Sequence, residues 1–319
     1  MEDDATMLST KRRNYSKEVR QIAKEDAVRA RDMLSQYFLA SRSSESGAPL
    51  PSSLPDRFIL LPDQRPPASS VAVSLPVIDL SRGRDEVINH GVSQQTMREM
   101  EEVCEEFFRL PAADKTALYS EDRFKRNRLF SGTIYGDRYW RDCLRLACAF
   151  PVGDTKNDWP DKPQSLREVI EKFIMPTRGV AMELLRLLSE GMGLRPDYFE
   201  GDLSGGDVVI HVNHYPPCPD PSLTLGLPPH CDRNLITLLL PGTVNGLQVV
   251  YKGEWINIIT NGMLKSIEHR AVANSALART SVAAFIMPAA DSLIGPAEEF
   301  VSKDNPPRYR PAIFGEFIR

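Results

Sequence analysis

The chain has no long apolar segment and few cysteines. None of its runs approaches the roughly 20 apolar residues that a membrane-spanning helix needs. The N-terminal sequence MEDDATMLSTKRR lacks the apolar core of a secretory signal. The five cysteines are odd in number and form no CxxC pair, which is atypical of a disulfide framework. These absences predict a cytoplasmic protein with reduced thiols and no membrane partner.

A strong excess of charge of either sign is also absent. The 39 basic and 43 acidic residues leave a formal net charge of -4 and a pI near 5.8. The bulk charge therefore gives no reason to expect nucleic acid as a partner. With 42% hydrophobic residues the chain can bury a substantial core. We expect a monomer that acts on a small molecule.

Composition divides the chain into four predicted parts. They are a helical extension and linker over 1–55, a mixed and largely helical region over 56–205, a β-rich core over 206–290 and a truncated C-terminal segment over 291–319. Apolar residues recur at helical spacing over 9–39, from Ser93 to Leu110 and over 165–193. We expect amphipathic helices there, with Ser93 as an N-cap.

The stretch from His211 to Pro288 contains the pattern that most constrains function. Its β-prone segments place His230 and Asp232 two residues apart, so in one strand both side chains would point to the same face. A further β-prone segment contains His269. Two histidines and one carboxylate are the facial set that holds non-haem Fe(II) with open coordination positions. The sequence therefore predicts an iron site at these three residues.

The remaining histidines fit a ligand role less well. A structural zinc site would fill its coordination with four protein groups, and the sequence offers no suitably placed fourth ligand. Strand alternation points His214 away from the metal, whereas His211 shares the inward face. His90 stands alone at the end of a predicted strand, which favours a structural role.

Arg279 and Ser281 repeat the two-residue spacing, and Arg279 follows His269 by ten residues. In a strand, the guanidinium and the hydroxyl would share one face and could bind a carboxylate together. This order of motifs, preceded by NHYPPCP, resembles the plant 2-oxoglutarate- and Fe(II)-dependent dioxygenases. The resemblance runs from Leu75 onward. It implies a mainly β fold with α additions, in which helices flank a double-stranded β-helix, or jelly-roll, core.

Within that family, the chain is most similar to the deoxymugineic acid hydroxylases of grasses, which modify iron-chelating phytosiderophores. The likeness rests on segments such as SLPVIDLSRGRDEV, YWRDCLRLAC and PPHCDRNLITLLLPG. It implies an oxidoreductase that hydroxylates a small plant metabolite of the mugineic acid type. Fe(II) would be the cofactor, 2-oxoglutarate and O2 the cosubstrates, and ascorbate a supporting reductant.

The same resemblance assigns roles around the predicted metal. It places the Tyr215 hydroxyl with Arg279 and Ser281 at the distal carboxylate of 2-oxoglutarate. It also places Asn213 close to the metal and the cosubstrate. No catalytic side chain beyond the metal centre is implied.

One wall of the substrate pocket in this family corresponds to the segment 126–150. Its candidate substrate contacts are Tyr135, Tyr139, Trp140 and Arg141, and ordinary packing is the alternative for the aromatic residues. A mugineate is a polycarboxylate amine, so cationic side chains are expected around it. Arg128, Arg138 and Arg141 are the candidates.

Two family segments are expected to be missing. GRDEV joins INHGV directly at Val87 and Ile88, and GEWINI leads into TNGMLKSIEHR near Ile258 and Thr260 without the usual strand. Unpaired backbone groups left on neighbouring strands would cost about 1 to 3 kcal/mol each where they are buried. Three alternatives therefore stay open: a catalytically impaired splice product, a metal-binding protein without activity, and an oxidase of another plant hormone or specialised metabolite.

Overall fold

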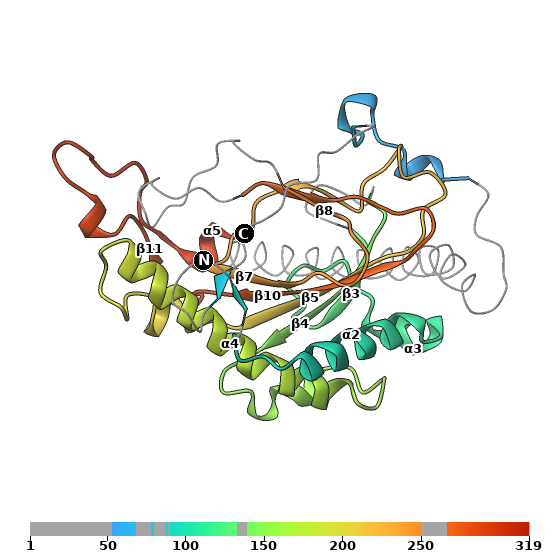
Figure 1. Ribbon diagram of the computed structural model, residues 1–319, viewed down its shortest axis with the longest axis horizontal. Coiled ribbons are helices and arrows are strands. Elements are labelled where there is room, and N and C mark those ends of the chain that lie inside the picture. The colour runs from blue at the N-terminus through green and yellow to red at the C-terminus, as the bar shows by residue number, and fades with distance from the viewer. Residues whose placement is uncertain are drawn as a thin grey trace, which may run out of the picture.

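The computed structural model of the protein describes residues 53–67, 90–132, 139–249 and 267–318, and the backbone of 78–79 and 87–88. The predicted helix over 9–39 and the predicted deletion near Ile258 and Thr260 lie outside the described residues. Two larger β-sheets and a group of helices make up the described part (Figure 1). None of its helices is long and apolar enough to cross a membrane.

The larger sheet has five strands, and every pairing in it is antiparallel. In spatial order the strands are β3 (Arg128–Phe130), β4 (Asp142–Cys148), β5 (Val208–Tyr215), β10 (Arg279–Ile286) and β7 (Ile236–Leu240). Val208, Ile210 and Val212 are buried on one face of β5, while the residues between them point to the other face. This alternation confirms the strand predicted at HVNHY and gives the sheet one face for a core and one for a site.

A smaller sheet of three antiparallel strands lies over the first one. Its strands, in spatial order, are β6 (Leu227–His230), β9 (His269–Ala271) and β8 (Leu247–Val249). In Figure 1, β8 lies above the five-stranded sheet, and helices α2, α3 and α4 lie below that sheet. Two antiparallel sheets packed face to face form the predicted jelly-roll sandwich.

Two further strand pairs lie outside the sandwich. β1 (Ile78–Asp79) pairs in parallel with β2 (Val87–Ile88), and β11 (Leu293–Ile294) pairs antiparallel with β12 (Ala312–Ile313). The residues that join β1 to β2 lie outside the described part, so the deletion expected at Val87 and Ile88 stays a prediction.

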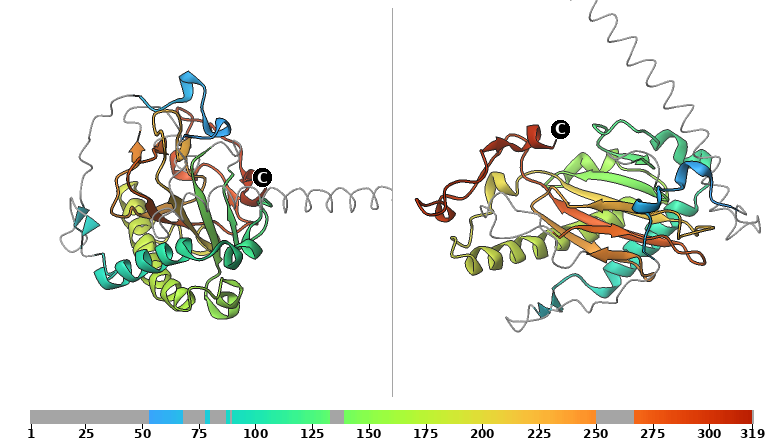
Figure 2. Two further views of the ribbon diagram at one scale, coloured as in Figure 1. Left: turned by 90° about the vertical axis from the view of Figure 1, so that its right-hand side faces the viewer. Right: turned by 90° about the horizontal axis from the view of Figure 1, so that it is seen from above.

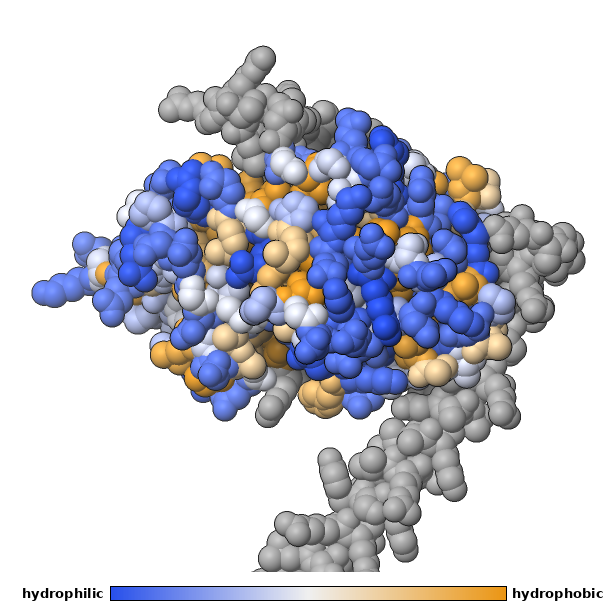
Figure 3. Space-filling view, turned by 90° about the horizontal axis from the view of Figure 1, so that it is seen from below, coloured by the Kyte–Doolittle hydropathy of each residue, from blue (hydrophilic) through white to orange (hydrophobic). Residues whose placement is uncertain are grey.

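Helices α2 (Gln94–Arg109) and α4 (Leu166–Gly191) cover the outer face of the five-stranded sheet (Figures 1 and 2). The two shorter α-helices are α3 (Ala112–Lys115) and α5 (Phe314–Phe317). Apolar residues of both long helices, among them Met100, Phe107, Ile170 and Ile174, pack in one core with sheet residues such as Val212. Seen from below, the surface of this side is mainly hydrophilic (Figure 3). The helices are therefore amphipathic, as predicted.

The start of α2 follows the predicted signal, and a left-handed glycine follows the end of α4. Ser93 caps α2, because its Oγ accepts a hydrogen bond from the Thr96 backbone N–H at 3.0 Å. α4 ends at Gly191, and Gly193 then adopts the left-handed conformation with φ of +74°. Apolar packing then holds both helices against the sheet whose opposite face lines the cavity.

His214 lies on the helix side of the sheet, as strand alternation predicted. Its ring stacks on Phe108 with the ring centres 4.6 Å apart, and its Nδ1 is 3.0 Å from Thr280 Oγ1. Burial lowers the pKa of this imidazole to about 3, and the positive charges of Lys115 and Arg109 add to the shift. The ring therefore stays neutral in the folded protein at neutral pH.

This lowered pKa predicts that the folded protein is less stable in acid. Below about pH 6.5 the unfolded chain takes up a proton at His214 that the folded protein does not bind. The free energy of unfolding should then fall by at most about 1.4 kcal/mol per pH unit from this residue. Denaturant unfolding at several pH values should show a smaller slope for His214→Gln than for the wild type, with His90→Gln as control. Equal slopes in wild type and His214→Gln would contradict the prediction.

Candidate functional site

A cavity of about 690 Å³ lies between the two sheets. One wall is the inner face of the five-stranded sheet, and residues of β6, β8 and β9 contribute the other. All residues predicted to bind metal or 2-oxoglutarate line it, namely Asn213, Tyr215, His230, Asp232, His269, Arg279 and Ser281. The fold thus brings together residues that span 69 positions of the sequence from Asn213 to Ser281.

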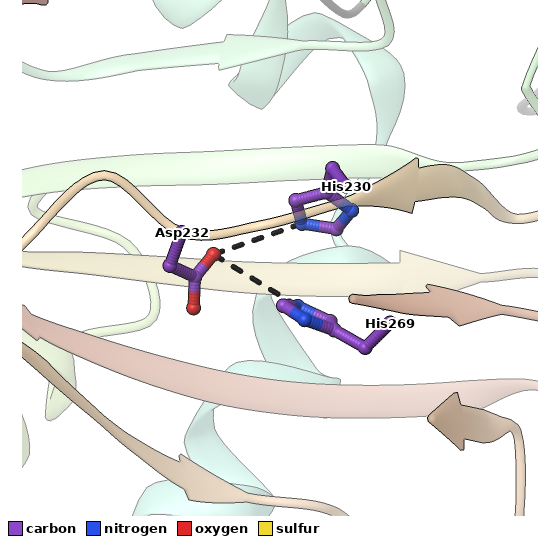
Figure 4. A group of neighbouring side chains, drawn as sticks. All are labelled: His230, Asp232 and His269. Carbon is purple, nitrogen blue, oxygen red and sulfur yellow. Dashed lines mark ion pairs between the residues drawn. The ribbon is translucent and has the colours of Figure 1, made fainter. Parts of the chain in front are cut away.

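His230, Asp232 and His269 form a compact group on the side of the three-stranded sheet (Figure 4). His230 ends β6, His269 begins β9, and the two residues pair directly across these strands. Asp232 Oδ1 is 3.7 Å from His230 Nε2 and 3.8 Å from His269 Nε2. One donor atom from each residue lies within 4.8 Å of the others. This spacing suits a single shared metal ion.

Backbone carbonyl groups favour the same tautomer in both imidazoles. His230 Nδ1 lies 2.8 Å from the Pro228 carbonyl oxygen. His269 Nδ1 lies 3.1 Å from the Ile267 carbonyl oxygen. Because a carbonyl only accepts, each Nδ1 carries the proton and leaves the Nε2 lone pair directed toward Asp232. Burial also lowers the pKa of His230, which favours the neutral, metal-binding form.

Asp232 is not in a strand, so the prediction of one strand carrying both His230 and Asp232 is wrong. β6 ends at His230, and the chain then crosses to the other sheet, where β7 begins at Ile236. From the start of β7, Thr237 Oγ1 donates a hydrogen bond to Asp232 Oδ2 at 2.7 Å. Asn234 Nδ2 donates to Thr237 Oγ1 at 3.0 Å. A side-chain hydrogen bond, rather than strand alternation, therefore orients the carboxylate.

Thr237→Val tests this orientation, because it removes the donor to Asp232 at nearly constant volume. We expect the apparent Kd for Fe(II) to rise about 10-fold, as for other partners of metal ligands. Anaerobic Fe(II) titration measures the effect. Thr280→Val, the same change on the opposite face of the five-stranded sheet, is the control. An unchanged Kd in Thr237→Val would show that this hydrogen bond does not support the metal site.

The four residues predicted to bind 2-oxoglutarate lie in register on β5 and β10. Arg279 is directly opposite Tyr215, and Ser281 is directly opposite Asn213. All four side chains are at most 7% exposed, and all line the cavity. Arg279 Nε donates to the Val244 carbonyl oxygen at 3.1 Å, and its guanidinium carbon is 5.2 Å from the centre of the Tyr215 ring. This patch offers a guanidinium, two hydroxyls and an amide, a set suited to a carboxylate.

Two glycines make room for this patch, and sequence reasoning missed both. A Cβ at Gly226 would lie 2.4 Å from Tyr215 Cδ1, and a Cβ at Gly246 would lie 2.9 Å from Arg279 Cδ. Both distances are shorter than a real Cβ contact allows, so only a residue without a side chain fits. The close approaches join segments far apart in the sequence, so local spacing carries no signal for them.

The residues predicted to contact substrate lie in different surroundings. Tyr135 is outside the described residues. Trp140 is 3% exposed, donates from Nε1 to the Pro216 carbonyl oxygen at 2.9 Å and packs in a small apolar cluster instead of lining the cavity. Arg141 does line the cavity, and its Nη1 donates to Asn213 Oδ1 at 2.9 Å. Substrate contact by Tyr135, Trp140 and Arg141 stays a prediction.

Arginine dominates the charged residues that line the cavity. The arginines are Arg123, Arg128, Arg141, Arg145, Arg233, Arg270 and Arg279. Among the described lining residues, the carboxylates are Glu121 and Asp232. Sequence reasoning named Arg128 but missed Arg145, because the direction of Arg145 depends on how β4 pairs with its neighbours. The cavity therefore favours an anionic ligand.

Known proteins share this sequence and fold. Residues 206–288 match the 2OG-Fe(II) oxygenase superfamily, and residues 82–162 match the family described as non-haem dioxygenase in morphine synthesis N-terminal. The 2'-deoxymugineic-acid 2'-dioxygenase of Hordeum vulgare is 60% identical, over 84% of this chain and 89% of that protein. The mugineic-acid 3-dioxygenase of the same plant is 53% identical, over 84% and 89%.

A solved structure agrees with these similarities. The crystal structure of JOX2 in complex with 2OG, Fe and JA has a TM-score of 0.76 and 32% identity, and the match covers 87% of this chain and 92% of that one. The alignment with the 2'-dioxygenase is 303 positions long. This is more than the number of residues in 84% of this 319-residue chain, which is the share that the alignment covers. The relative therefore has positions that this chain lacks, and the missing segments expected at Val87/Ile88 and Ile258/Thr260 stay a prediction.

The described residues fit the groups that this family uses. Two imidazole nitrogens and one carboxylate oxygen beside the cavity are a donor set for Fe(II), and the patch around Arg279 suits the carboxylate of 2-oxoglutarate. Donor chemistry, fold and sequence similarity thus agree. The chain belongs to the 2OG-Fe(II) oxygenase superfamily and is a 2-oxoglutarate-dependent dioxygenase with a small-molecule substrate.

Proposed function

We propose that His230, Asp232 and His269 hold the Fe(II) of this enzyme. The convergence of their donor atoms supports the proposal, as do the carbonyl groups that leave both Nε2 atoms free to bind metal. Three protein ligands leave coordination positions for 2-oxoglutarate and O2. The observation that carries the proposal is that this group and the Arg279 patch line one cavity.

Arg279, Ser281 and Tyr215 bind the distal carboxylate of 2-oxoglutarate in this proposal. The guanidinium gives two parallel charge-assisted hydrogen bonds, and the hydroxyls add further donors. Asn213, held by Arg141, borders the metal and the cosubstrate. Bound Fe(II), with 2-oxoglutarate and O2, supplies an oxidative decarboxylation that yields succinate and CO2 and hydroxylates a C–H bond. The protein residues orient the cosubstrate and exclude water around it.

The substrate that we propose is a mugineic-acid-type phytosiderophore, with 2'-deoxymugineic acid as the first candidate. The name of the 60% identical relative supports this choice. So does the excess of arginines over carboxylates around the cavity, because a mugineate carries several carboxylates. Arg141 and Tyr135 are proposed contacts, and packing is the alternative for Trp140.

A substrate panel tests this proposal. The purified full-length chain is supplied with Fe(II), ascorbate and 2-oxoglutarate, and then with 2'-deoxymugineic acid, mugineic acid, a flavanone or hyoscyamine. We expect succinate to form in step with a product one oxygen atom heavier, and to form fastest with 2'-deoxymugineic acid. Faster turnover of the flavanone or hyoscyamine would favour oxidation of another plant metabolite.

Two further outcomes separate the remaining alternatives. No turnover of any compound, combined with Fe(II) binding and a cooperative thermal transition, would indicate a metal-binding protein without activity. No cooperative transition would indicate a catalytically impaired splice product that folds poorly. Transcript sequencing across Val87/Ile88 and Ile258/Thr260 would show whether the missing segments are present in the message.

We also propose that the enzyme is a cytoplasmic monomer without nucleic-acid or membrane partners. Its five cysteines are free thiols, which supports a reducing compartment.

The four-part division of the chain stays part of the proposal, and the family matches over 82–162 and 206–288 support its two central parts. Light scattering coupled to size-exclusion chromatography tests the monomer, and a dimeric mass would overturn it.

A further inference from the structure

A row of basic side chains crosses the inner face of the five-stranded sheet. Arg128 on β3 is directly opposite Arg145 on β4, and Arg145 is directly opposite His211 on β5. All three residues line the cavity. Residues paired across neighbouring strands point to the same side of a sheet. The row therefore presents two guanidinium groups and one imidazole to the cavity.

The positive charge of this row has no ion-pair partner within the described protein. None of the ion pairs among the described residues includes Arg128 or Arg145. The Glu121 carboxylate accepts hydrogen bonds from a tyrosine hydroxyl and two backbone N–H groups, and Asp207 pairs with Arg126 at 2.9 Å. Like charges directly opposite one another in a sheet are destabilising. The free protein therefore carries a repulsive pair beside the cavity.

Arg128 is held firmly in this position. Its side chain is 7% exposed, its Nη1 donates to the Ser120 carbonyl oxygen at 2.9 Å, and its guanidinium carbon is 3.8 Å from the centre of the Phe130 ring. Its Nε is buried and has no hydrogen-bond partner among the described residues. Arg145 is anchored through Nη1 to the Arg126 carbonyl oxygen. A buried charge without an oppositely charged partner costs free energy, which an anionic ligand would recover.

The row is separate from the anchor for 2-oxoglutarate. His211 is four residues from Tyr215 along β5, and Tyr215 is the residue opposite Arg279. Four residues of an antiparallel strand span about 14 Å. The five-carbon chain of 2-oxoglutarate is shorter than this backbone separation, which favours a second anion at the row. Such an anion would neutralise Arg128 and Arg145.

The row and the proposed metal group line the same cavity. Burial lowers the pKa of His211 well below its usual range, the guanidinium of Arg145 adds to the effect, and His230 from the facing sheet contributes as well. The imidazole is therefore neutral and can donate or accept a hydrogen bond. A ligand on the row would occupy the cavity beside the metal.

We infer that Arg128 and Arg145 form a subsite that binds a carboxylate of the primary substrate, with His211 as a neutral hydrogen-bonding neighbour. The inference rests on the proposed function, because it takes this cavity as the substrate site. It deepens that function by requiring a substrate that carries a carboxylate away from the C–H bond to be oxidised. Binding relieves the repulsion between the two arginines and gives each a charge-assisted partner.

Calorimetric titration of the enzyme loaded with Mn(II) and saturating 2-oxoglutarate tests the subsite. The ligand is 2'-deoxymugineic acid, and the variants are Arg128→Gln and Arg145→Gln. We expect each substitution to raise the Kd for 2'-deoxymugineic acid about 10- to 100-fold, because each removes a charge-assisted hydrogen bond. Arg126→Gln removes a nearby charge that does not line the cavity, and should change the Kd less than about 5-fold. Arg145→Lys keeps the charge and should give an intermediate Kd.

Substrate analogues identify the group that is bound. If one carboxylate of 2'-deoxymugineic acid contacts the row, its carboxamide should bind wild type and Arg145→Gln equally. Far-ultraviolet circular dichroism on heating checks that the variants are folded. Equal affinity of wild type and both glutamine variants for the acid would overturn the subsite. An equal loss of affinity for the acid and for every carboxamide would overturn it as well.

The failure of the proposed substrate is a separate result. If the wild type neither binds nor oxidises 2'-deoxymugineic acid, the proposed function fails for that compound. The same titration is then run with tricarballylate, a tricarboxylate without an amine. Tighter binding by the wild type than by Arg128→Gln and Arg145→Gln would support a carboxylate subsite for another substrate. Equal binding, or none, would reject it.

Discussion

Asp232→Ala is expected to lower succinate formation at least about 100-fold. The loss of a hydrogen bond to a metal ligand typically costs about 10- to 100-fold in metal affinity or activity, and the loss of the ligand itself should cost at least as much. The variant leaves His230 and His269 without the carboxylate that lies between their Nε2 atoms. Succinate release under saturating Fe(II) and 2-oxoglutarate, and anaerobic Fe(II) titration, measure the two effects.

Asp154→Ala is the matched control for this change. Asp154 is exposed and lies in a 3-10 helix that does not line the cavity, so the same loss of one carboxylate should leave metal binding and turnover unchanged. The thermal transition of Asp232→Ala should resemble that of the metal-free wild type. If Asp232→Ala kept wild-type Fe(II) affinity, the metal site would have to lie elsewhere.

Arg279→Lys should give the second large effect, a rise of about 10- to 100-fold in the KM for 2-oxoglutarate. Lysine keeps the positive charge but loses the planar fork that makes two parallel hydrogen bonds to a carboxylate. It also loses the hydrogen bond from Arg279 Nε to the Val244 carbonyl oxygen, which orients the side chain. Initial rates at varied 2-oxoglutarate measure the KM.

The control for Arg279→Lys is Arg195→Lys, because the Arg195 side chain is 68% exposed and does not line the cavity. A further check uses the primary substrate, whose proposed subsite is the row of Arg128 and Arg145. Its KM should respond less to Arg279→Lys than the KM for 2-oxoglutarate does. A reversed order would place the cosubstrate at the row and the substrate at Arg279.

The sequence predicted those parts of the site that depend on local periodicity. Alternation along a strand correctly separated His211, which lines the cavity, from His214, which faces the helices. The same alternation placed Arg279 and Ser281 on one face, and the register with β5 now adds their partners across the sheet.

The parts that were missed depend on contacts between distant segments. Asp232 is outside the predicted strand because the chain crosses there from one sheet to the other. A hydrogen bond from Thr237 orients its carboxylate. The need for glycine at 226 and 246 arises only when a ring and a guanidinium from other strands approach them. Arg145 became a candidate only once its neighbours across β3 and β5 were known. Contacts between distant segments, and not the local preference for helix or strand, determine the position of each of these residues.

The division of the site between the two sheets has a thermodynamic consequence. His230 and His269, two of the three proposed metal ligands, lie on the three-stranded sheet, and the proposed carboxylate anchor lies on the five-stranded one. A cosubstrate that contacts both acts as a crosslink, and its binding free energy adds to the cohesion of the sandwich by mass action. Binding of 2-oxoglutarate is therefore linked to the stability of the folded protein. A chain that lacks family segments in this sandwich would regain part of its stability from 2-oxoglutarate itself, and cellular supply of that metabolite would then influence how much folded enzyme persists.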